Sequence, residues 1–228
     1  MSTIVDTMRN QTISASKLGD PKRPRNAIAT REAILRAALI AFTRAGYDGA
    51  GVREIAQEAG VTAMLVNRYF GSKKALFAAA VEVIFKEARL LKGDIASLSR
   101  VVARGLVQET SMAVSPTDPL LLMLRSAANP EAAAILRDRI SRRFQDPLAT
   151  SLVGPEATQR AALCLSLIAG FQFMHRVIGI TALADSNSDR LARRLEALFE
   201  LLTSPLESKL NPIRPKPANK PTRKAISQ

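Results

Sequence analysis

Cysteine and histidine are nearly absent from this chain of 228 residues, which contains one of each, Cys164 and His175. One cysteine excludes an intramolecular disulfide, and two soft ligands are too few for a typical zinc site. Along a single helix the two residues would lie about 16 Å apart, too far for a catalytic dyad within that helix, although a partner from another subunit could complete one. Because glycine-rich phosphate loops and nucleophile-elbow motifs are also missing, we expect no metal, no cofactor and no catalytic residues.

Long apolar runs are absent as well. No stretch of eighteen consecutive apolar residues occurs, and the first thirty residues lack the apolar segment of a secretory signal. We therefore expect a cytoplasmic protein with no membrane partner. Hydrophobic residues still make up 47% of the chain, which is enough to bury a core.

Acidic residues are outnumbered by basic ones, 20 to 33, and the formal net charge of +13 indicates a polyanionic partner. The excess lies at the ends, since residues 1–29 carry +3 and residues 208–228 carry +6, whereas residues 78–207 are almost neutral. We expect residues 205–228 to form a disordered basic tail, because several prolines prevent a helix there. This tail either stays solvated or adds nonspecific contacts to DNA.

Residues 1–29 show no helical periodicity and contain Gly19, Pro21 and Pro24, so we expect a flexible basic arm. Its basic run, residues 21–25, comes shortly before the first predicted helix at Thr30. Such an arm either reaches into a DNA minor groove, as homeodomain arms do, or remains solvated.

The most informative pattern lies in residues 51–77, which predict two short helices joined by a tight turn. Apolar residues within 52–59 recur at intervals of three and four, which places them on one face of a helix. Gly60 follows where the chain must turn, because glycine adopts positive φ at little cost. Thr62 can then cap a second helix over about 63–70. This arrangement is typical of a helix-turn-helix.

The second helix of this pattern suits the major groove of DNA. Val66 and Phe70 can pack inward, which leaves other side chains on the outer and leading surface. Those side chains are Ala63, Met64, Asn67 and Tyr69. After the potential cap Ser72, Lys73 and Lys74 begin another helix. Because cations are unfavourable at a helix start, we expect both lysines to meet an anion outside the fold, such as a phosphate.

From Thr30 to Phe77 the sequence resembles the DNA-binding domain of the TetR family, the tetracycline repressor-like bacterial regulators. The matching segments are Thr30–Leu35, Phe42–Tyr47, Ile55–Val61 and Tyr69–Phe77. Two positions depart from the family pattern, since Asn67 stands where tyrosine is common and Gly51 where a capping threonine or serine is frequent. An amide can read adenine through two hydrogen bonds and a phenol cannot, so Asn67 alters the expected base preference.

The resemblance implies an all-α protein with a three-helix helix-turn-helix domain, residues 30–77, followed by an α-helical ligand-binding and dimerisation domain, residues 78–204. It also implies double-stranded operator DNA as a partner and a homodimer formed through the last two long helices. The residues carried over as base or phosphate contacts are Thr30, Arg53, Thr62, Ala63, Met64, Asn67, Tyr69, Lys73 and Lys74.

Capping signals divide the larger domain into helices, and no strand alternation is present. The clearest signals pair a capping residue with a proline at the first helical position. They are Asp118-Pro119, Asn129-Pro130 and Asp146-Pro147. The last two long helices are predicted from Gly154 to about Ala182 and from Ser188 to about Thr203.

The family resemblance further implies a pocket for a small hydrophobic or amphipathic effector. Side chains of the middle helices either line such a pocket or form ordinary core. The candidate ligand contacts are Met123, Phe144, Phe171, Gln172 and His175. The leading prediction is a homodimeric repressor that this effector releases from DNA. An effector-independent regulator and an architectural DNA-binding protein are the alternatives.

Overall fold

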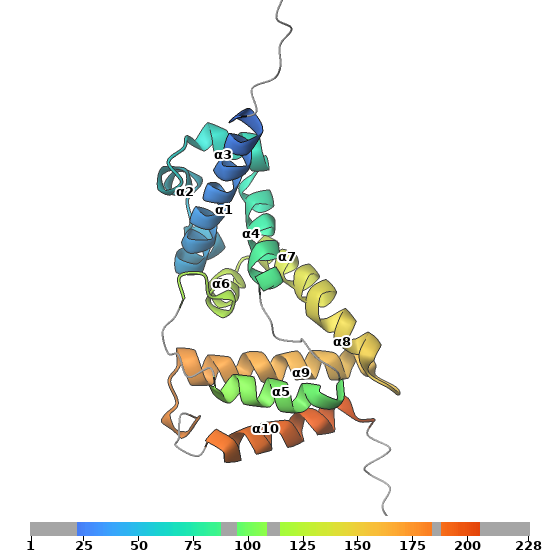
Figure 1. The fold of residues 1–228 in the computed structure, drawn as a ribbon. Coiled ribbons are helices and arrows are strands. Elements are labelled where there is room, and N and C mark those ends of the chain that lie inside the picture. Colours follow the sequence, from blue (N-terminus) through green and yellow to red (C-terminus); the bar gives the residue numbers. More distant parts are fainter. Residues whose placement is uncertain (1–21, 88–94, 109–114, 184–187, 206–228) are drawn as a thin grey trace, which may run out of the picture.

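The computed structural model describes residues 22–87, 95–108, 115–183 and 188–205, and all regular structure within them is helical (Figure 1). The α-helices are α1 (Lys22–Gly49), α2 (Val52–Glu58), α3 (Ala63–Phe70), α4 (Lys73–Glu87), α5 (Ile95–Gln108), α6 (Pro119–Ser126), α7 (Pro130–Ile140), α8 (Asp146–Ser151), α9 (Ala157–Gln172) and α10 (Ser188–Thr203). Figure 1 shows α1 to α4 at one end and α5, α9 and α10 at the other. The all-α prediction is confirmed, and no helix among the described residues is long and apolar enough to cross a membrane.

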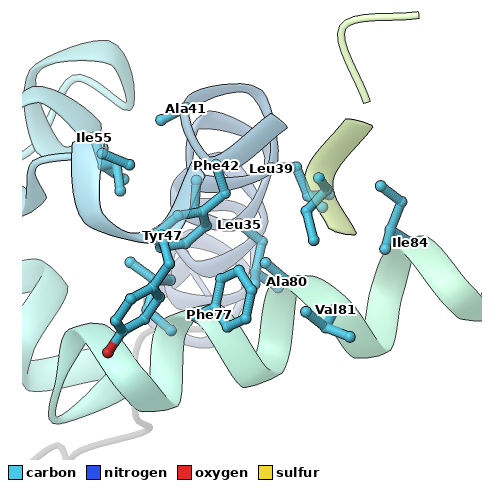
Figure 2. Close-up of a cluster of buried hydrophobic side chains, with 14 of the residues drawn as sticks. Leu35, Leu39, Ala41, Phe42, Tyr47, Ile55, Phe77, Ala80, Val81 and Ile84 are labelled. Atoms are coloured by element: carbon cyan, nitrogen blue, oxygen red, sulfur yellow. The ribbon is translucent and has the colours of Figure 1, made fainter. Parts of the chain in front are cut away.

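The first hydrophobic core holds α1 against α4 and includes three aromatic rings that meet one another (Figure 2). The ring centroids of Phe42 and Phe77 are 5.0 Å apart at 86°, and Tyr47 meets Phe77 at 5.0 Å and 74°. Both are the edge-to-face geometry that aromatic pairs favour. Ile55 of α2 and Val66 of α3 are buried in the same core, which therefore fixes the helix-turn-helix against α1 and α4.

A second core joins α5, α8, α9 and α10 and includes Leu148, Ile168 and Phe199. Leu165 of α9 is half-buried and packs against both cores. Helices α6 and α7 belong to the first core, through buried side chains such as Leu122. Packing therefore crosses the sequence boundary expected at residue 78, because part of the larger region is built onto the helix-turn-helix.

The end of α1 lies so close to α6 that residue 46 has no room for a side chain. Gly46 has a φ of 71°, and a Cβ there would lie 2.2 Å from the carbonyl oxygen of Arg125. The Arg125 side chain donates from Nη1 to the carbonyl oxygen of Thr43 at 2.6 Å. Glycine is therefore required here for the packing of α6 as well as for the backbone turn.

The first helix begins at Lys22 rather than at the predicted Thr30. Residues 22–29 are therefore helical, and the prediction of a flexible arm is wrong for them. Pro24 is compatible with this start because it is the third helical residue, where no hydrogen-bonded N–H is needed. The rest of the predicted arm lies outside the described residues, as does the predicted tail beyond residue 205.

Asp146 and Pro147 do not begin a new helix, which corrects the prediction made from this pair. The chain stays helical from Pro130 to Ser151, and Asp146 itself has helical angles of −64° and −45°. A π-helical turn over 141–145 precedes the proline, and the Asp146 N–H donates to the carbonyl oxygen of Ser141. This wider turn lets a proline sit in a helix that would otherwise break or kink.

The other two capping signals are confirmed. The Asp118 carboxylate accepts from backbone N–H groups at 2.9 and 3.3 Å, and the Asn129 amide oxygen accepts from two at 3.0 Å. The long helix predicted to reach Ala182 is shorter. After α9 a π-helical turn continues to Val177, and Gly179, with a φ of 74°, ends it. The last helix, α10, has the predicted bounds.

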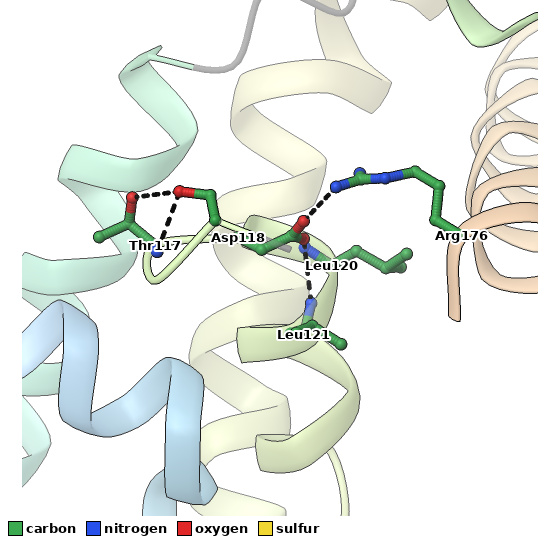
Figure 3. A network of polar contacts seen from close by, with 6 residues as sticks. Thr117, Asp118, Leu120, Leu121 and Arg176 are labelled. Carbon is green, nitrogen blue, oxygen red and sulfur yellow. Dashed lines mark hydrogen bonds and ion pairs between the residues drawn. The ribbon is translucent and has the colours of Figure 1, made fainter. Parts of the chain in front are cut away.

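Two arginine side chains, buried Arg160 and half-buried Arg176, join segments that are distant in sequence. Arg160 donates to the backbone carbonyls of residues 153–155 and of Thr203 at 2.7 to 3.4 Å, which ties the start of α9 to the end of α10. Arg176 forms an ion pair with Asp118, whose other oxygen caps α6 (Figure 3). The segment after α9 thereby holds the start of α6 and links the two cores.

We expect Gly46→Ala to lower the free energy of unfolding by about 2 kcal/mol or more, because alanine is strained at positive φ and its Cβ would displace α6. Gly105→Ala on α5 is the matched control, since nothing lies within 4 Å of a Cβ there. That variant should be neutral or more stable by about 0.5 to 1 kcal/mol. Chemical denaturation measures both, and equal stabilities would contradict the close approach of α6.

Candidate nucleic-acid interface

The turn between α2 and α3 is built as the sequence predicts. Gly60 has a φ of 67°, and the Val61 N–H returns to the carbonyl oxygen of Ala56 at 2.9 Å, which closes α2. The Thr62 hydroxyl oxygen accepts a backbone N–H at 3.3 Å and caps α3. Gly51 precedes α2 as its N-cap residue, and it forms no side-chain cap because glycine has no hydroxyl group. Short-range hydrogen bonds therefore fix the relative direction of the two helices.

Three side chains share the exposed face of α3. Met64 is 80% exposed, Asn67 and Arg68 are also exposed, and Val66 on the opposite face is buried. Residues at i, i+3 and i+4 lie on one side of a helix, so Met64, Asn67 and Arg68 form a single surface, here called the α3 face. Arg68 is absent from the predicted contacts, although its spacing from Met64 indicates this position. Its guanidinium has no hydrogen bond or ion pair with any described residue.

Several other predicted contacts lie away from the α3 face. Ala63 and Tyr69 are half-buried and pack against the first core, rather than standing on the outer surface. Thr62 is exposed at the start of α3, and Thr30 is half-buried on α1. Arg53 on α2 is exposed and makes no hydrogen bond or ion pair within the described parts of the chain, so an external anion has access to it.

One arginine of α1 lies beside the end of α3. The Arg31 guanidinium carbon is 5.0 Å from the ring centroid of Phe70, which is a cation-π contact. Arg31 is exposed, and it is also absent from the predicted contacts. No local sequence signal could identify it, because the contact joins two helices that are far apart in the chain.

Both lysines at the start of α4 also have partners within the protein. Lys73 donates to the carbonyl oxygen of Asp48 at 3.3 Å, and its Nζ lies 5.0 Å from the ring centroid of Tyr47. Lys74 forms an ion pair with Glu131 of α7, with 3.1 Å between Nζ and Oε1. The sequence pattern did not predict these internal partners, because they come from α1 and α7, and the phosphate contacts stay a prediction.

The Glu131 carboxylate is shared between two elements of the helix-turn-helix region. Lys74 uses one oxygen, and the Tyr47 hydroxyl donates to the other. Burial and this hydrogen bond raise the pKa of Tyr47 to about 12. The hydrogen bonds from Tyr47 and Lys74 lower the pKa of Glu131. At neutral pH the tyrosine therefore remains a donor and the glutamate remains charged.

The five predicted ligand contacts lie in two different parts of the described structure. Met123 and Phe144 pack in the first core. Phe171 and His175 are buried near the end of α9 with ring centroids 5.5 Å apart, and Gln172 between them in sequence is half-buried. The five side chains are thus divided between two regions of the fold.

Neither of two hollows found among the described residues contains a predicted ligand contact. One of about 10 Å³ lies in the second core beside Cys164, far below the roughly 300 to 1,000 Å³ of a ligand pocket. Burial raises the pKa of the Cys164 thiol to about 11, which disfavours a reactive thiolate. The other hollow, about 550 Å³, is an open groove between α4 and α7 that includes Lys74 and Glu131. The ligand contacts stay a prediction.

Family models match two separate stretches of the chain. Residues 34–80 match the model for bacterial regulatory proteins of the tetR family, and residues 97–202 match the tetracyclin repressor-like C-terminal domain. Together they span about two thirds of the sequence. The chain belongs to the TetR family. Among curated proteins, none matches this TetR-family chain significantly.

Solved structures of bacterial transcriptional regulators share its fold. A regulator from Rhodococcus sp. Rha1 is 25% identical, with a TM-score of 0.53 over 75% of this chain and 95% of its own. A TetR-family regulator from Agrobacterium tumefaciens is 18% identical, with a TM-score of 0.55 over 74% and 98%. NalD, the secondary repressor of the MexAB-OprM multidrug efflux pump in Pseudomonas aeruginosa, is 19% identical, with a TM-score of 0.53 over 75% and 95%.

We expect Asn67→Ala to change the sequences that this TetR-family protein selects from a random DNA pool. An amide on the α3 face can bond one base edge through two hydrogen bonds, and its loss should cost about 1 to 3 kcal/mol of discrimination at that position. Circular dichroism checks that the variant is folded. An unchanged base preference in a folded variant would exclude Asn67 from base recognition.

Proposed function

We propose that this protein is a homodimeric transcriptional regulator that binds operator DNA through α3 and represses the genes it controls. The α3 face carries the proposal, because Met64, Asn67 and Arg68 project from a helix whose opposite side is fixed in the first core. Asparagine and arginine can each bond a base through two hydrogen bonds, and methionine offers an apolar contact. A recognition helix in the major groove uses such side chains.

Dimerisation is part of the proposal because one short α3 contacts few base pairs. The two helix-turn-helix domains of a dimer, here called the reading heads, can contact both halves of a palindromic site. Helix α9 has an exposed strip at three- and four-residue spacing, with small residues at its centre that allow a partner helix to approach. The strip consists of Leu163, Ser166 and Gly170 of α9 and continues to Met174 in the π-helical turn that follows. Helix α10 also exposes Leu198 and Leu201. These faces suit a four-helix interface made by α9 and α10 of both protomers.

A small hydrophobic or amphipathic effector completes the proposal by shifting the protein toward a conformation with misplaced reading heads. A series of contacts from the segment after α9, through α6, to α1 supports this part. Arg176 holds Asp118 at the start of α6, and α6 is locked onto α1 at Arg125 and Gly46. His175 Nδ1 and Arg176 Nε are buried without a hydrogen-bond partner among the described residues, so an effector there can supply one. A compound that raises the melting temperature and releases DNA would support this step.

Selection of bound sequences from a random DNA pool tests the function. We expect a palindromic site to be enriched and its binding to survive an excess of random DNA. Equal binding to all sequences would instead support an architectural protein.

We expect Lys73→Ala to weaken binding to all sequences to a similar degree and to reduce the salt slope by about one per head, because a phosphate contact carries no base information. Lys86→Ala, which removes the same charge from the last turn of α4, is the control and should change neither quantity. Binding isotherms at several salt concentrations measure both variants. If the two variants behave alike, the phosphate role of Lys73 is excluded.

We expect Leu163→Glu to convert the dimer to a monomer, because it places a charge in the middle of an apolar interface. Leu124→Glu on α6 is matched in exposure, 43% compared with 48% at Leu163, and should remain dimeric. Sedimentation equilibrium distinguishes the two states. A dimeric Leu163→Glu variant would contradict an interface through α9.

A further inference from the structure

The first turn of α7 reaches across to the start of α4 and places one carboxylate between two side chains of the helix-turn-helix region. Glu131 accepts from the Tyr47 hydroxyl with one oxygen and pairs with Lys74 through the other, 3.1 Å from its Nζ. Glu131 belongs to the C-terminal family domain, whereas Tyr47 and Lys74 belong to the N-terminal one. A single side chain of one domain therefore holds a predicted phosphate contact of the other.

Neighbouring contacts fix the position of this carboxylate. The Asn129 side chain donates to Asp48 Oδ1 at 2.8 Å, and its amide oxygen caps α7 by accepting from the Glu131 N–H at 3.0 Å. Asn129 thus attaches the first turn of α7 to the end of α1. The Tyr47 ring is buried against Phe42 and Phe77, with its hydroxyl directed away from that cluster (Figure 2). Asn129 and Tyr47, which position the Glu131 carboxylate, are therefore both held in place by the fold.

We propose that Glu131 is a positioning residue that competes with a DNA phosphate for the Lys74 ammonium, so that the C-terminal domain sets how much positive charge the reading head offers to DNA. The proposal rests on the proposed DNA-binding function. It goes beyond it, because it assigns to one carboxylate of α7 a direct influence on DNA affinity.

The chemistry of the three groups supports this competition. Lys74 is 60% exposed, so a phosphate can reach it, and a phosphate and a carboxylate are alternative anionic partners for one ammonium. An ammonium at the start of a helix opposes the helix dipole, and Glu131 offsets that effect while no DNA is bound. When Lys74 turns to a phosphate, Glu131 keeps the hydrogen bond from Tyr47. The exchange therefore leaves no buried polar group without a partner.

The affinity of the full-length protein for its selected DNA site tests the proposal through Glu131→Gln. The glutamine oxygen can still accept from Tyr47, but its neutral amide no longer holds Lys74. We expect Glu131→Gln to tighten binding by about two- to fivefold per head, as for the loss of an exposed ion pair. The same substitution in a Lys74→Ala background should change affinity by less than this, because the competing pair is already absent.

Asp138→Asn is the matched control for charge. Asp138 lies on the same helix, its side chain is 44% exposed as that of Glu131 is, and it pairs with Arg142 at 2.7 Å. Asp138→Asn should leave DNA affinity unchanged. Glu131→Ala is a second variant for the case that glutamine perturbs α7, because alanine has the highest helix propensity and the Asn129 cap remains.

The possible outcomes separate the two proposals. Two results would show a general effect of negative charge and overturn the role of Glu131. One is that Glu131→Gln raises DNA affinity as much in the Lys74→Ala background as without it. The other is that Asp138→Asn raises DNA affinity equally. Folded Glu131→Gln and Glu131→Ala variants that bind like the original protein would overturn it as well. If the original protein selects no DNA sequence, the proposed function itself fails, and this result is distinct from the others.

Discussion

The close approach of α6 to Gly46 is the constraint on which the arrangement of the other elements depends. The carbonyl oxygen of Arg125 lies where a side chain at residue 46 would be, so α1 and α6 cannot slide past each other without losing that fit. The Arg125 and Asn129 side chains add hydrogen bonds to the end of α1 on either side of the turn between α6 and α7. The helix-turn-helix, α6 and the start of α7 also share one hydrophobic core.

The sequence predicted the reading head well because its signals act over three or four residues. Gly60 ends α2 through its positive φ, Thr62 caps the start of α3, and Gly71, with a φ of 78°, ends α3. The caps at Asp118 and Asn129 were predictable for the same reason. Arg68 could also have been placed on the α3 face, since helical spacing alone relates it to Met64.

The features that sequence did not predict depend on contacts or backbone changes that local patterns do not encode. Pro147 is a strong signal for a helix start, but a preceding π-helical turn accommodates it within a continuous helix. The partners of Lys73 and Lys74 come from α1 and α7, so the charge at the start of α4 is partly used inside the protein. The contact of Arg31 with the end of α3 likewise requires the tertiary fold.

Arg160 and Arg176 differ in how many acceptors hold each guanidinium group. Among the described residues, Arg160 donates to backbone carbonyls alone, one of them at the C-terminal end of α10, where the helix dipole favours a cation. This joint lies within the second core, and breaking it would expose several carbonyls at once. Arg176 instead depends on one carboxylate, Asp118, which also caps α6 and lies between the cores. This contact between the cores therefore rests on one carboxylate, whereas the joint within the second core rests on four backbone carbonyls.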